Sequence, residues 1–258
     1  MNAAVAQVGV LARRSVVRTL RQPAQIVPAL VFPLFLLAVN ASGLAAATNL
    51  PGFPTNSYLT FALAIPFMQG ALFSVMTGGT ELAGDIESGF LNRLALTPLS
   101  GIGLLAGQLA GVVAMGLIQA AAYLIVGLSA GAGLAAGAGG VAVIVALSVL
   151  MAIGFGGIGL FVALRAGTAE AVQGMFPVFF VFLFLSSMNL PRNLIETDWF
   201  RTVATYNPVS YLVEGIRSLL VTGWDGEALG LAFGVAGAVL VLGLAAASMA
   251  LRTRLVRT

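Results

Sequence analysis

Six long apolar stretches dominate the chain, and each is close to the roughly 20 residues that an α-helix needs to cross a bilayer. They lie at residues 26–47, 58–80, 102–128, 141–164, 171–190 and 228–251. Only 8% of the 258 residues are charged, whereas an average soluble domain carries roughly 25%. These features predict an all-α membrane protein with six transmembrane helices.

Several chemically reactive residue types are missing from the chain. It contains no Cys and no His, and all 12 basic residues are Arg. The first two absences exclude disulfides, Ser-His catalysis and His-ligated metals. Without Lys the chain cannot form the Walker A loop that holds ATP phosphates. We therefore expect no catalytic, metal-binding or cofactor-binding residues, and any ATP hydrolysis would belong to a separate subunit.

The arginines are distributed unevenly about the six stretches. If both termini share one side of the membrane, that side carries nine arginines and the opposite side three. Cytoplasmic flanks are rich in Arg and Lys, so the termini are predicted to be cytoplasmic. Arginines at membrane flanks also account for the net charge of +3, and we expect no nucleic-acid partner.

Residues 1–22 form a separate predicted element before the six-span domain at residues 23–258. Arg13, Arg14, Arg18 and Arg21 alternate with apolar residues at helical spacing. A signal peptide would instead place its basic residues before the apolar run. The pattern favours an amphipathic helix on the cytoplasmic membrane surface, and a frayed basic tail is the alternative.

Two polar connections interrupt the apolar stretches, and the first spans residues 81–101. Leu91 and Leu94 share one helical face there, and Pro98 would end the helix. Such a short amphipathic helix can dock in a groove of a soluble partner. The residue pattern alone equally allows an ordinary solvated turn.

The second polar connection spans residues 191–227. Asn207 followed by Pro208 is a typical helix start, and Gly223 is a plausible stop. Glu214 and Arg217 are three residues apart and can pair on one helical face. We predict two short helices, at residues 193–204 and 208–221, that dip back into the outer leaflet. A helix pair resting on the surface is the alternative.

The first connection resembles the cytoplasmic loop of ABC-2 type transporter permeases. The run from Asp85 to Leu94, followed by Thr97 and Pro98, carries the likeness. The resemblance implies a coupling helix that contacts an ATPase subunit. The residues assigned to this contact are Glu81, Asp85, Glu87, Gly89, Leu91, Arg93, Leu94, Thr97 and Pro98.

The second connection also resembles these permeases, most closely those of the daunorubicin-resistance drug exporter type. The residues that match in order, and are assigned to an external gate of re-entrant helices, are Pro191, Trp199, Asn207, Pro208, Tyr211, Glu214 and Arg217. The resemblance implies two ATPase subunits that bind ATP and Mg, and a second copy of this permease or a homologous one. It also implies a bacterial cytoplasmic membrane and outward transport of a drug, antibiotic or lipid.

The apolar stretches carry no acidic residue near their centres. Ion-coupled transporters usually hold a buried ionisable group there, so an ion-coupled secondary transporter is a weaker alternative. An exporter of lipid-linked glycans would need a more polar pathway and is a second alternative. The candidate residues for a substrate pathway are Phe67, Gln69, Phe73, Phe176 and Phe180. Small-residue runs at Gly107/Gly111 and Gly230/Gly234/Ala238 are candidate helix interfaces.

Overall fold

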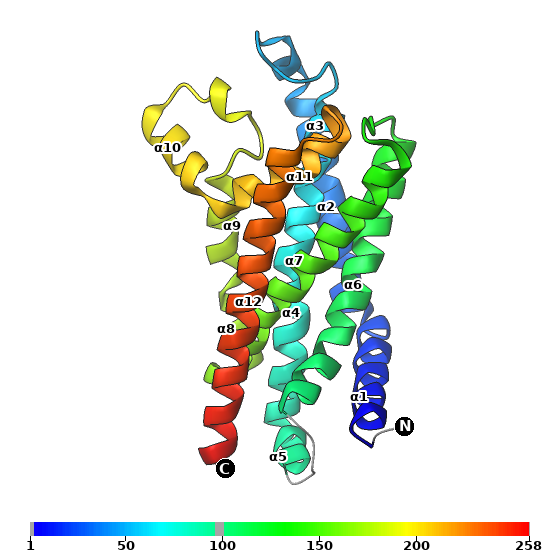
Figure 1. Ribbon diagram of the computed structural model, residues 1–258, viewed down its shortest axis with the longest axis vertical. Coiled ribbons are helices and arrows are strands. Elements are labelled where there is room, and N and C mark those ends of the chain that lie inside the picture. The colour runs from blue at the N-terminus through cyan, green and yellow to red at the C-terminus, as the bar shows by residue number, and fades with distance from the viewer. Residues whose placement is uncertain (1–2, 96–100, 258) are drawn as a thin grey trace.

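The computed structural model describes residues 3–95 and 101–257, and within these ranges it is helical without any β-strand. Long helices run along the axis of an elongated bundle (Figure 1). One end of the bundle, here called the α5 end, carries α1 (Ala3–Leu20), α5 (Phe90–Ala95) and the last turns of α12 (Gly226–Arg257). The opposite end, called the α10 end, carries η1 (Ala45–Asn49) and α10 (Asp198–Tyr206).

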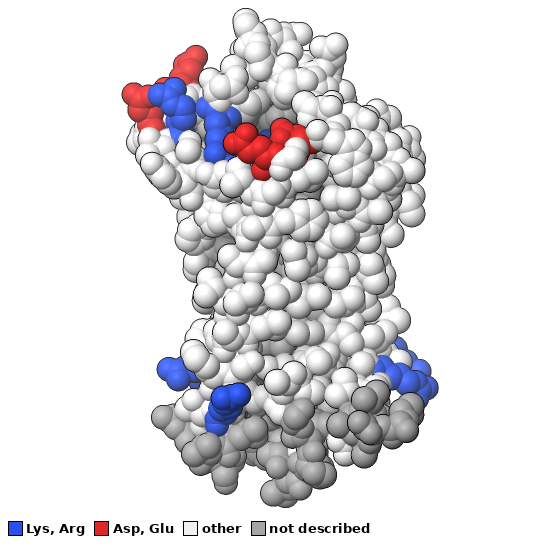
Figure 2. All heavy atoms as spheres, viewed as in Figure 1, with Lys and Arg blue, Asp and Glu red and all other residues white. Residues whose placement is uncertain are grey.

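Five helical segments in the described residues are long and apolar enough to cross a membrane. They are α2 (Pro23–Gly43), α3 with α4 (Tyr58–Glu87), α6 (Gly101–Ser129), α7 (Gly137–Ala166) and most of α12 (Gly226–Arg254). On the face shown in Figure 2, charged side chains gather at the two ends, and the belt between them has none. This distribution suits a multi-pass membrane protein.

The central helix is α4 (Ala64–Glu87), preceded by the short α3 (Tyr58–Ala62). In the most apolar part of this span, 83% of the residues are buried. The helix is interrupted at Leu63 because the ring of Pro66 conflicts with the carbonyl four residues earlier, that of Ala62. α4 then continues to Glu87, well past the predicted end at residue 80. The acidic residues expected in a loop therefore lie on the last turns of a helix.

The fifth apolar stretch, expected as one helix at residues 171–190, is divided. α8 (Ala169–Gly174) and α9 (Phe176–Phe184) are separated at Met175, and together they are shorter than the five spans. Pro177 explains the division because it cannot donate a backbone hydrogen bond to the preceding turn. Residues 185–191 then continue without regular helix.

The second polar connection contains η2 (Arg192–Leu194), α10 (Asp198–Tyr206) and α11 (Pro208–Val221). α11 has the predicted bounds, and Gly223 follows it with a φ of 102°. A left-handed residue at this position commonly ends a helix, and glycine adopts it without steric cost. The first predicted helix was placed too early, since the chain is irregular from Ile195 to Thr197 and α10 begins only at Asp198.

Glycines permit close contact between the central helices. A Cβ atom at Gly159 of α7 would collide with the backbone carbonyl of Val75 on α4. At Gly243 of α12, a Cβ would lie 2.6 Å from the carbonyl oxygen of Gly154 on α7. By contrast, Cβ atoms at Gly230 and Gly234 would meet nothing within 4 Å. This predicted small-residue run therefore lies on an open face of α12 in the single chain.

Candidate functional site

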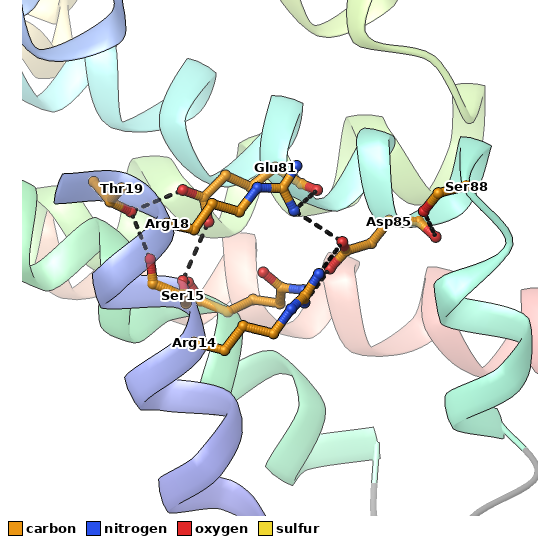
Figure 3. Close-up of polar contacts among 8 residues, drawn as sticks. Arg14, Ser15, Arg18, Thr19, Glu81, Asp85 and Ser88 are labelled. Carbon is orange, nitrogen blue, oxygen red and sulfur yellow. Dashed lines mark hydrogen bonds and ion pairs between the residues drawn. The ribbon is translucent and has the colours of Figure 1, made fainter. Parts of the chain in front are cut away.

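A polar network joins α1 to the last turns of α4 at the α5 end (Figure 3). At its centre is the carboxylate of Asp85, a residue that is 2% exposed. Arg14 donates two hydrogen bonds to it, at 2.9 and 2.7 Å, and Arg18 donates one at 2.8 Å. Gln108 of α6 donates a fourth at 2.7 Å. The buried charge is therefore fully hydrogen-bonded and paired.

One turn earlier on α4, Glu81 is equally buried. Its two carboxylate oxygens accept hydrogen bonds from Thr19 at 2.8 Å and from Ser15 at 3.2 Å, and its backbone carbonyl accepts one from Arg18 at 3.3 Å. Glu81 is four residues from Asp85, as Ser15 is from Thr19. The two helices therefore meet with matching one-turn repeats.

The helix α1 approaches closely because α6 carries small residues beneath it. A Cβ atom at Gly107 would lie 2.6 Å from the Cβ of Leu11. A Cβ atom at Gly111 would collide with the hydroxyls of Ser15 and Thr19. These two glycines, predicted as a candidate helix interface, pack against α1 of the same chain.

Arg14 links three elements of the α5 end. Its hydrogen bonds to Asp85, together with the charge of that carboxylate, raise the pKa of the Arg14 guanidinium above its ordinary value. The same guanidinium lies 4.0 Å from the ring centroid of Phe90, the first residue of α5. Cation–π contacts of this kind stabilise partly exposed pairs. Arg14 thus connects α1, α4 and α5.

The short helix expected in the first polar connection is α5 in the described residues. It follows Gly89, whose φ of 69° is a conformation that favours glycine. Leu91 is 2% exposed, Leu94 is half-buried and Arg93 is exposed, so the leucines and the arginine lie on different faces as expected. Thr97 and Pro98 lie outside the described residues.

The three acidic residues assigned to an external contact separate into two groups. Glu81 and Asp85 are buried and bonded within the chain, so the structure directs them toward α1 and not toward the surface. Glu87 is exposed, and its carboxylate accepts a hydrogen bond of 3.2 Å from the backbone of Ala169 at the start of α8. The difference from the expectation arises because α4 continues into the segment read as a loop.

Sequence reasoning missed the partners of these acids. They are Arg14, Ser15, Arg18, Thr19 and Gln108. A usable signal was present, because the acids on α4 and the arginines on α1 both repeat at four-residue spacing. The spacing shows that each pair shares a helix face, but it does not show that the two faces meet.

At the α10 end, Glu214 connects α11 to η2 and to the irregular segment after α9. It accepts hydrogen bonds from Arg192 at 2.8 and 2.7 Å and from the hydroxyl of Ser187 at 2.6 Å. The guanidinium of Arg192 also lies 4.3 Å from the ring centroid of Tyr211. The two-point contact fixes the orientation of η2 over α11.

Arg217 does not pair with Glu214, and the predicted ion pair is wrong. The Arg217 side chain is buried, and it donates to the backbone carbonyls of Phe61, Ser187 and Met188 at 3.1, 3.0 and 2.7 Å. These carbonyls lie beside the break between α3 and α4 and in the irregular segment after α9, where helical donors are missing. A guanidinium carries five N–H donors in one plane, so the single side chain of Arg217 can bond all three carbonyls. The guanidinium also lies 3.6 Å from the ring centroid of Phe61.

Asn207 acts as the predicted N-cap of α11. Its side-chain oxygen accepts a hydrogen bond from the backbone of Val209 at 2.9 Å. Its amide nitrogen donates to the carbonyl of Phe182 at 2.6 Å, near the end of α9. The capping residue therefore also fastens α11 to α9.

The other residues predicted at this end take different places. Tyr211 donates to the carbonyl of Thr205 at 2.8 Å, which closes the turn between α10 and α11. Pro191 immediately precedes η2, and Pro208 is the first residue of α11. Trp199 is 63% exposed beside Phe200.

Phenylalanines from α2, α4 and α9 form a continuous aromatic cluster. Phe73 lies 5.1 Å from Phe176 between ring centroids, and Phe176 lies 4.6 Å from Phe180. Phe32 of α2, which sequence reasoning did not select, contacts both Phe180 at 5.9 Å and Phe73 at 6.5 Å. A cavity of about 280 Å³ adjoins this cluster. It is lined by Ala24, Gln25, Pro28, Phe73, Met76, Thr77, Thr80 and Gln173.

Two of the five predicted pathway residues lie elsewhere, inside the bundle. Phe67 is buried and its ring meets that of Tyr123 edge-on at 5.6 Å. Gln69 is also buried. The aromatic cluster therefore includes Phe73, Phe176 and Phe180 of the predicted set, but not Phe67 or Gln69.

Comparison with known proteins identifies the family. Residues 6–221 match the ABC-2 type transporter family. The chain belongs to this family. It is also 26% identical over 225 residues to a Porphyra purpurea protein named as a transport permease, ycf38, with coverage of 86% of this chain and 76% of the relative.

The part of this ABC-2 permease that matches the family contains both sites. It runs from within α1 to the last residue of α11, and so includes the network around Asp85, the contacts of Arg217 and the aromatic cluster. Family membership supports a transport permease role for the chain. The absence of Lys, and so of a Walker A loop, is consistent with membership in a family of membrane permeases.

Proposed function

We propose that the chain is the transmembrane subunit of an ATP-driven exporter in which separate subunits bind and hydrolyse ATP. The observation that carries this proposal is the attachment of α5, whose Arg93 is exposed, to α1 and α4 through Arg14. A motor outside the membrane needs such a firmly held contact element. The substrate would be a hydrophobic or amphipathic compound, as in the drug exporter permeases that the sequence resembles.

The proposed topology has six crossings, with α8 and α9 as the shorter fifth. Ala169–Phe184 contains only 16 residues, about 24 Å of helix, so the irregular residues 185–191 would complete the crossing. Two carbonyls of this segment, those of Ser187 and Met188, accept hydrogen bonds from Arg217. Non-helical backbone is tolerated at membrane depth when its polar groups are bonded within the protein in this way. The arginine distribution favours a cytoplasmic α5 end. α10 and α11 would then form the external gate.

The proposed contact with the ATPase subunit uses the exposed part of the predicted coupling segment. Glu87 and Arg93 are exposed around α5, and Gly89 is partly exposed. Leu94 is half-buried against the core, and the segment would continue into residues 97 and 98. The buried Leu91 would anchor α5 to the core of the bundle. Glu81 and Asp85 would support the contact indirectly by holding α1 against α4.

The proposed substrate pathway follows the aromatic cluster at the open sides of α2 and α9. Phe35 of α2 and Phe184 of α9 are 60% and 54% exposed, so these faces are uncovered in the single chain. A second permease, either a copy or a homologue, would close them and form a pathway between the two. The cavity of about 280 Å³ beside Phe73 would form part of its wall.

Co-purification with the ATPase subunit tests the proposal. A tagged chain carrying Arg93→Glu should lose most of the ATPase subunit, because the contact helix then presents the opposite charge. Arg252→Glu, which alters an exposed arginine of α12, should keep it. Equal retention by both variants would contradict the coupling role of α5.

Transport in inside-out vesicles tests the energy source. Uptake of a hydrophobic dye should require ATP and the ATPase subunit, and it should persist when ion gradients are collapsed. Uptake driven by an ion gradient in ATP-depleted vesicles would contradict the proposal and establish a secondary transporter. Transport of a lipid-linked glycan instead of the dye would contradict the substrate class alone.

A further inference from the structure

A groove of about 600 Å³ runs along one side of α1 at the α5 end. Among the described residues, those that line it recur with a helical repeat of three and four positions, so they form one continuous face. They are Val10, Arg13, Arg14, Val17, Arg18 and Arg21. Four guanidiniums on one face of a single helix make an anion-binding surface.

The charge of this groove is only partly compensated inside the chain. Arg14 and Arg18 share the carboxylate of Asp85, and their side chains are still 38% and 30% exposed. Arg13 and Arg21 are exposed, and their side chains make no hydrogen bond or ion pair in the part of the chain that the structure describes. The groove therefore has unused donors and a positive charge.

The apolar residues of α1 face outward beside these arginines. Val10 is 69% exposed and Leu20 is 48% exposed, whereas Ser15 and Thr19 are buried against the bundle. The outer face of α1 carries both valines and arginines, and the helix lies next to α6, which crosses the membrane. Such a face suits the boundary between lipid headgroups and acyl chains. An acidic protein surface would satisfy the arginines, but it would leave the apolar residues without acyl chains to contact.

We propose that this groove binds the headgroup of an anionic phospholipid. The phosphate would accept hydrogen bonds from Arg13 and Arg21, and the acyl chains would follow Val10 and Val17. Because Arg14 and Arg18 line the same groove, a bound lipid would lie directly against the network that holds Asp85. This inference needs only a multi-pass membrane protein, so its failure and the failure of the proposed transport function would be distinguishable.

Native mass spectrometry of the full chain in neutral detergent tests the site, with dioleoyl-phosphatidylglycerol compared with dioleoyl-phosphatidylcholine. The phosphatidylglycerol should bind at least tenfold more tightly. Arg13→Gln with Arg21→Gln should weaken its binding roughly 25-fold, since each surface arginine contributes roughly fivefold. Arg13→Lys with Arg21→Lys should restore most of the affinity. The matched control is Arg165→Gln with Arg252→Gln, two exposed arginines of α7 and α12, which should change it little.

Four results would overturn the proposal. Unchanged phosphatidylglycerol binding in the Arg13→Gln/Arg21→Gln chain would remove the site. An equal loss in the control pair would reduce the effect to general charge attraction. Full competition by millimolar inorganic phosphate, or loss of the ATPase subunit from this variant with lipid binding intact, would assign the groove to free phosphate or to a protein partner.

Discussion

The two ends of the bundle both hold buried charge, but they satisfy it in different ways. At the α5 end, Asp85 is surrounded by side chains from α1 and α6. At the α10 end, Arg217 is surrounded by backbone carbonyls. Side-chain donors can turn toward water, whereas carbonyls in fixed segments cannot. The α10 end is therefore expected to be the rigid one, and the α5 end is the one that can rearrange.

The largest expected effect comes from Arg217→Met. It keeps a long side chain but leaves three buried carbonyls without their donor, and such losses cost roughly 3–5 kcal/mol in total. Thermal unfolding of the purified chain in detergent should show a strongly lowered midpoint. Arg201→Met, which breaks the exposed pair with Asp198 and a long hydrogen bond of 3.4 Å to the carbonyl of Ile195, should cost under about 1 kcal/mol. Equal effects of the two variants would contradict the comparison.

A smaller loss is expected from Asp85→Asn. The substitution keeps the shape of the side chain but removes the charge that Arg14 and Arg18 share. The new amide nitrogen would also face N–H groups that cannot accept a hydrogen bond from it. Both arginines are partly exposed and can turn to water, so we expect a loss of roughly 1–3 kcal/mol. Glu87→Gln at the surface is the matched control and should unfold like the unmodified chain. A loss larger than that of Arg217→Met would reverse the assignment of the rigid end.

Gly111→Ala separates packing from charge at the α5 end. The new methyl group would meet the hydroxyls of Ser15 and Thr19, and overpacking of this kind costs about 1–3 kcal/mol. Proteolysis should then cleave near α1 faster than in the unmodified chain. Gly234→Ala, on the open face of α12, should leave cleavage unchanged. Equal protection in both variants would show that α1 is not held by this contact.

The smallest effect is expected from Glu81→Gln. The amide oxygen can still accept from Thr19, and the hydroxyl of Ser15 can rotate to accept from the amide nitrogen. The free energy of unfolding should change by less than about 1 kcal/mol, as measured by denaturation in detergent. A loss above that of Asp85→Asn would place the essential charge of the network at Glu81.

The sequence predicted what depends on local spacing. The start of α11 at Asn207 and Pro208 and its end before Gly223 follow from capping rules, and the structure confirms them. The positions of the long apolar helices follow from length and hydropathy. The short turn at Leu63 agrees with the kink expected from Pro66, because Leu63 keeps helical φ and ψ angles of −59° and −21°.

The partners of the charged residues were not predictable in the same way. Glu214 and Arg217 have the spacing of an ion pair, yet the irregular segment after α9 brings Arg192 to one and free carbonyls to the other. Likewise, Asp85 meets Arg14 across 71 positions of chain. Such contacts depend on how helices cross, and a single sequence with helical repeats does not specify the crossing.

The most direct test concerns Asp85 as the residue that holds α1, α4 and α5 together. The chain contains no Cys, so Val10→Cys and Arg93→Cys can carry spin labels on α1 and α5 without background. Pulsed electron resonance in lipid nanodiscs should give a narrow distance distribution, and the addition of Asp85→Asn should broaden it markedly. A distribution that stays equally narrow with Asp85→Asn would contradict the account.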